Sequence, residues 1–70
     1  MTKPQLKAKV REICNFSKRE LNIFACDLSI SLLDHKYKRI LNIAIGLRQL
    51  ELEELSVSPL MVMSEIDSIS

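Results

Sequence analysis

The most reactive side chains of this sequence are those of two cysteines, Cys14 and Cys26, and one histidine, His35. Together with carboxylates such as Asp27 and Asp34, these residue types bind zinc, and a Cys–His pair can act as a nucleophile with its base. The spacing fits neither site, because there is no Cys-x-x-Cys pair, no second histidine and no evident group to orient a Cys–His pair. The sequence therefore predicts no catalytic residue, no metal site and no cofactor.

Basic side chains are the second group with a chemical use, since several of them together bind phosphates. Residues 1–48 contain all ten Lys and Arg and four of the nine Asp and Glu, whereas residues 49–70 contain the other five acids. One interpretation is that the two oppositely charged halves attract each other, within one chain or across a dimer. The other is a nucleic-acid surface made by Lys7, Arg11, Lys18, Arg19, Lys36, Lys38 and Arg39.

A run of flexible apolar residues near the C-terminus is the third candidate site. Methionine side chains adapt to irregular partners and are frequent at binding surfaces. In a short terminal helix, such residues either complete the core or contact another protein. The candidate protein-binding residues are Leu60, Met61, Met63 and Ile66.

The chain has 70 residues, of which 47% are hydrophobic, and this is a large apolar content for a domain with so little interior. We expect one helical domain over residues 1–67 and a frayed end over residues 68–70. Some of the apolar side chains should face another protein or a second copy of the chain. No apolar run approaches the ~18 residues that a membrane span needs, and residues 1–20 are too charged for a signal peptide, so we expect a cytoplasmic protein.

The first two helices are predicted from their start signals and apolar stripes. Thr2-Lys3-Pro4 favours a helix start, and Leu6, Val10 and Ile13 follow at helical spacing. A second start lies in the stretch FSKREL, at residues 16–21. There Ser17 and Glu20 are predicted to form a capping box, and Phe16 and Leu21 a hydrophobic staple.

The second helix is predicted to be apolar around much of its circumference. Such a helix is buried on more than one side, which requires a partner in so small a chain. Its predicted core stripe contains Leu21, Phe24, Ala25, Leu28 and Leu32, and it is widened by Ile23, Ile30 and Leu33.

Residues 28–47 allow two interpretations. Their alternating apolar residues are compatible with a β-hairpin, but the connection lacks the Asn-Gly or Asp-Gly turn typical of tight hairpins. The preferred interpretation is a third helix, with Asp34 as its N-cap. Its predicted buried stripe contains Tyr37, Ile40, Leu41, Ala44 and Leu47.

Ser58 as an N-cap and Pro59 at the first helical position predict a short last helix. The predicted fold is therefore all-α, a small bundle of three helices plus a short C-terminal helix, completed by self-association. The preferred function is a non-enzymatic regulatory or adaptor protein that acts through protein–protein contact, as a homodimer. The alternative is a nucleic-acid-binding regulator, antitoxin-like or transcriptional, with a basic N-terminal face and an acidic C-terminal segment.

Overall fold

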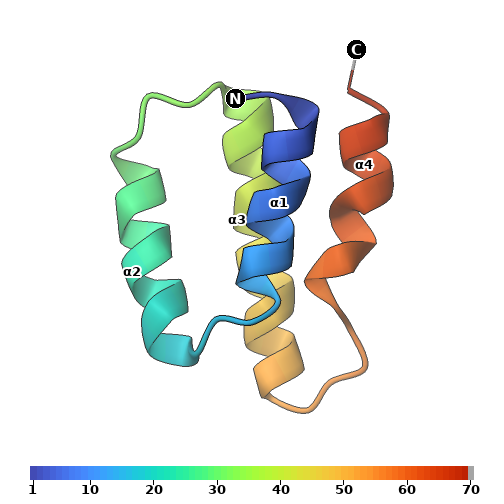
Figure 1. The fold of residues 1–70 in the computed structure, drawn as a ribbon. Coiled ribbons are helices and arrows are strands. Elements are labelled where there is room, and N and C mark those ends of the chain that lie inside the picture. Colours follow the sequence, from blue (N-terminus) through green and yellow to red (C-terminus); the bar gives the residue numbers. More distant parts are fainter. Residues whose placement is uncertain (70) are drawn as a thin grey trace.

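The computed structural model describes residues 1–69 and is built from helices joined by short connections (Figure 1). No strand occurs in this part of the chain, so the all-α prediction is confirmed and the hairpin alternative for residues 28–47 is wrong. The predicted frayed end falls partly on Ser70, which lies outside the described residues. The elements are α1 (Lys3–Ile13), α2 (Lys18–Ser29), α3 (His35–Leu52), the 3₁₀ helix η1 (Pro59–Val62) and α4 (Met63–Asp67).

Local hydrogen bonds set the starts of α1 and α2. The Thr2 hydroxyl oxygen accepts from the Gln5 N–H at 3.3 Å, and the Gln5 side chain accepts from the Thr2 N–H at 2.8 Å. At α2, the Ser17 hydroxyl oxygen accepts from the Glu20 N–H at 3.2 Å, and the Glu20 carboxylate accepts from the Ser17 N–H at 3.1 Å. Both starts are capping boxes, and the one predicted at Ser17 is confirmed.

Asp34 caps α3 as predicted, since its carboxylate accepts from the Lys36 N–H at 2.9 Å. The other end of α3 closes without glycine, although its last turn needs a left-handed residue. Glu54 takes that conformation with φ of 64°, and the N–H of Leu55 then donates to the carbonyl of Leu50 at 3.1 Å. This is the bond pattern of a Schellman cap, with a strained residue at the position where glycine is usual.

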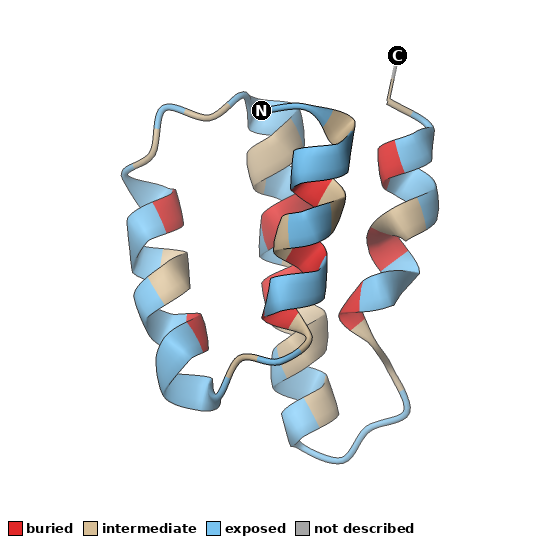
Figure 2. Ribbon diagram, in the orientation of Figure 1, coloured by how far each residue is buried: buried red, intermediate tan, exposed pale blue. Residues whose placement is uncertain are grey.

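The elements alternate in direction, with α1 and α3 running one way and α2 and η1–α4 running the other (Figure 1). α3 packs against α1, α2 and η1, and α1 also packs against η1 and α4, whereas α2 rests mainly on α3. The buried side chains lie where α1, α3 and η1–α4 meet and along one edge of α2 (Figure 2). They are Leu6, Val10, Ile13, Leu21, Leu28, Ile40, Leu41, Ala44, Ile45, Val62 and Ile66.

α2 is shorter than its apolar pattern predicts. It ends at Ser29, so Ile30 and Leu32 lie in the connection to α3, and both side chains are exposed. The Ser29 hydroxyl donates to the Cys26 carbonyl at 2.6 Å, and the Ser31 hydroxyl oxygen accepts from the Leu33 N–H at 3.1 Å. Such local bonds compete with helix extension. The prediction that Leu32 lies on the buried stripe of this helix is therefore wrong.

Candidate functional site

The reactive side chains do not meet. Cys14 follows the end of α1 and His35 begins α3, and because these helices run in the same direction the two residues lie at opposite ends of the bundle (Figure 1). Burial, followed by the nearby Glu51 carboxylate, raises the pKa of the half-buried Cys14 thiol. Cys26 is exposed on α2. Within residues 1–69, no three His, Cys, Asp or Glu side chains come together to hold a metal ion.

The candidate phosphate-binding residues are split between two ends of the molecule. Lys18 and Arg19 lie in the first turn of α2, whereas Lys36 and Arg39 lie in the first two turns of α3. Since α2 and α3 run in opposite directions, their first turns lie at opposite ends (Figure 1). The described structure therefore does not place these cations on one continuous surface, which strong phosphate binding requires.

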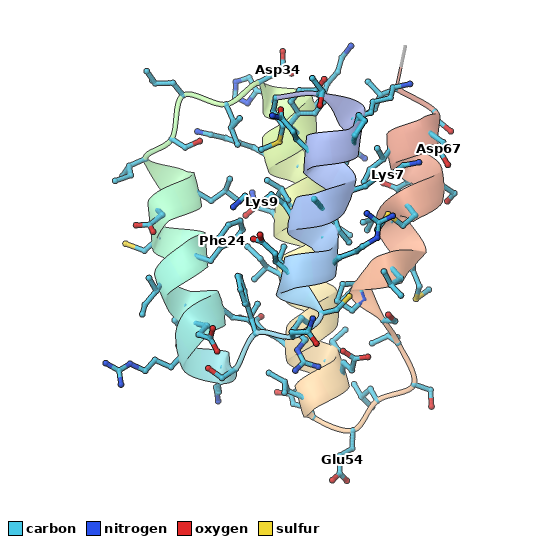
Figure 3. The ribbon with its side chains drawn as sticks, viewed as in Figure 1. Lys7, Lys9, Phe24, Asp34, Glu54 and Asp67 are labelled. Carbon is cyan, nitrogen blue, oxygen red and sulfur yellow. The ribbon has the colours of Figure 1, made fainter. Side chains whose placement is uncertain are left out.

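The remaining candidate cations lie on α1 and α3, and one of them is already paired. Lys7 forms an ion pair with Asp67 of α4, and Figure 3 shows the two side chains pointing toward each other. Arg11 is exposed on α1 and Lys38 is half-buried on α3. The Lys7–Asp67 pair joins the basic half of the sequence to the acidic half within one chain, and an exposed pair of this kind contributes about 0–1 kcal/mol to folding.

Arg48 has a structural contact that sequence reasoning missed. Its Nε donates to the Phe16 carbonyl at 3.0 Å, and its guanidinium pairs with Glu51 at 2.7 Å. The first bond fastens α3 to the corner between α1 and α2. No sequence pattern links these residues, because they are 32 positions apart.

The predicted protein-binding residues divide between the surface and the core. Leu60 and Met61 are 49% and 62% exposed, and both belong to η1. Met63 is half-buried against the core, and Ile66 is fully buried in it. Ile66 therefore serves the core and offers no surface to a partner, because α4 turns it toward α1.

Three further apolar side chains lie at the end of α3 and just beyond it. Leu50, Leu52 and Leu55 are all exposed, and the cap at Glu54 folds the chain back so that it leads into η1, which packs on α3. Figure 3 shows Glu54 at this extremity of the molecule. We use the name end surface for four exposed apolar side chains of this part of the chain, which are Leu50 and Leu55 at and after the end of α3 and Leu60 and Met61 of η1.

A second group of exposed apolar side chains lies on α2 and on Ile30, the residue that follows it. Ile23 is 55% exposed, Ile30 is 79% exposed, and Cys26 between them is also exposed. We call these three residues the α2 surface. They point away from the core, which α2 contacts through Leu21 and Leu28.

The space between α1 and α2 is incompletely filled. A cleft of about 130 Å³ lies there, with an almost entirely apolar lining that includes Met1, Phe24, Leu28 and Leu41. Figure 3 shows Phe24 of α2 pointing toward α1, with Lys9 beside it. The rings of Phe24 and Phe16 are 5.6 Å apart, so the corner is packed while the rest of this side stays open.

No helix within residues 1–69 has the length and apolar character that crossing a membrane requires. No protein family, curated protein or solved structure was found to match this chain.

Proposed function

We propose that this chain is a non-enzymatic helical adaptor or regulatory protein that binds another protein through the end surface. One observation carries the proposal. Eleven hydrophobic residues are buried in the core, and nine large apolar side chains of residues 1–69 nevertheless remain exposed. Four of them belong to the end of α3, the connection that follows it and η1. Exposed apolar side chains concentrated in one stretch of the fold, rather than scattered singly, are typical of binding sites.

The charges around the end surface indicate the chemistry of its partner. Glu53 and Glu54 lie beside it at the end of α3, whereas Glu51 is paired with Arg48, and residues 49–69 contain no Lys or Arg. An apolar centre with an acidic rim fits an amphipathic helix whose polar edges are basic. A second copy of the same surface would place carboxylates against carboxylates, so the partner at this site is a different protein.

Nucleic-acid binding is the competing function, and the geometry supports it less. The candidate cations Lys18 and Arg19 lie at the start of α2, and those of α3 lie at the opposite end of the bundle. Lys7 is already paired with Asp67. If phosphates were nonetheless the ligand, the affinity would fall steeply as salt rises.

Fluorescence anisotropy with three labelled probes tests the proposal. The probes are a Leu/Lys amphipathic helical peptide, its Leu/Glu counterpart and a short duplex DNA. We expect the Leu/Lys peptide to bind best. Leu60→Asp and Met61→Asp should weaken that binding by about tenfold or more, because each buries a carboxylate against apolar side chains.

Leu32→Asp is the matched control, because Leu32 is fully exposed in the connection after α2, away from the end surface. It should leave the affinity for the Leu/Lys peptide unchanged, and circular dichroism should show all three variants folded. Equal affinity of the wild type and the Leu60→Asp variant, or preferential binding of DNA with a steep salt dependence, would overturn the proposal.

A further inference from the structure

We draw no further inference here: the strongest candidate, the apolar cleft of about 130 Å³ between α1 and α2, carries no proposal, because nothing in the structure of residues 1–69 shows what occupies it.

Discussion

α2 and the rest of the bundle are held in place by different means. α1 buries three residues and α3 buries four, at the junction that both share with η1 and α4. α2 has a capping box as complete as that of α1, yet buries only Leu21 and Leu28 out of twelve residues and borders an open apolar cleft. The helix is therefore well specified locally and weakly supported by tertiary packing. The comparison shows that the formation of a helix and its coverage by the core have separate causes.

Truncation of one buried leucine in α1 and one in α2 should reveal the difference in tertiary packing most strongly. Leu6 is fully buried in α1, while Leu28 of α2 lines the open cleft. We expect Leu6→Ala to reduce the free energy of unfolding by about 3–4 kcal/mol and Leu28→Ala by about 2 kcal/mol, because fewer atoms surround the second site. Urea denaturation followed by circular dichroism measures both.

The expected loss at Leu6 is large compared with the total free energy of unfolding of so small a domain. A domain of this size has a free energy of unfolding of about 4–10 kcal/mol, so the loss expected for Leu6→Ala is a large share of the total. The two variants should therefore be compared at the same concentration of a stabilising osmolyte. Equal losses at both sites, or a larger loss at Leu28, would show that α2 is as firmly packed as α1.

A smaller effect is expected at the end of α3, on the well-packed side. Glu54 has a positive φ, which costs an L-residue roughly 1 kcal/mol. Glu54→Gly should therefore raise the free energy of unfolding by about 0.5–1 kcal/mol, in part offset by the greater freedom of glycine in the unfolded chain. Glu54→Ala is the control, because it removes the charge and keeps the strain. If Glu54→Ala raises the free energy of unfolding as much as Glu54→Gly does, the removed charge and not the backbone strain explains the gain.

The smallest expected effect is a pH dependence at the start of α2. Hydrogen bonds from the Ser17 backbone N–H, and then from the Ser17 side chain, lower the pKa of Glu20 below its ordinary value. A lowered folded-state pKa contributes stability above the unfolded-state value of about 4.3, and this contribution disappears as the pH falls through the folded-state value. Melting temperatures of the wild type and Glu20→Gln should therefore differ slightly at pH 7, and the difference should disappear as the pH falls below the folded-state pKa of Glu20. A difference that persists at low pH would contradict this origin.

The sequence predicts the helix starts well and the extent of the apolar faces poorly. Ser17, Asp34 and Ser58 cap helices as expected, because caps depend on residues only two or three positions apart. Leu32 illustrates the other case. Its spacing continues the stripe of α2, but serine side chains bond the backbone at the helix end and the residue becomes exposed.

The candidate site was predictable only in part for a similar reason. Leu60, Met61, Met63 and Ile66 are equally apolar in sequence, and only tertiary packing separates the exposed first two from the buried Ile66. The exposure of Ile23 was also hidden, since an apolar residue on a helix normally predicts burial.

The central claim is that the exposed apolar side chains of the end surface bind another protein, and the affinity of the unmodified chain for the Leu/Lys peptide tests it most directly. Fluorescence anisotropy should show that this peptide binds more tightly than the Leu/Glu peptide and the duplex DNA, and that Leu60→Asp weakens its binding. Equal affinity for the two peptides, or equal affinity of the wild type and the Leu60→Asp variant for the Leu/Lys peptide, would contradict the claim.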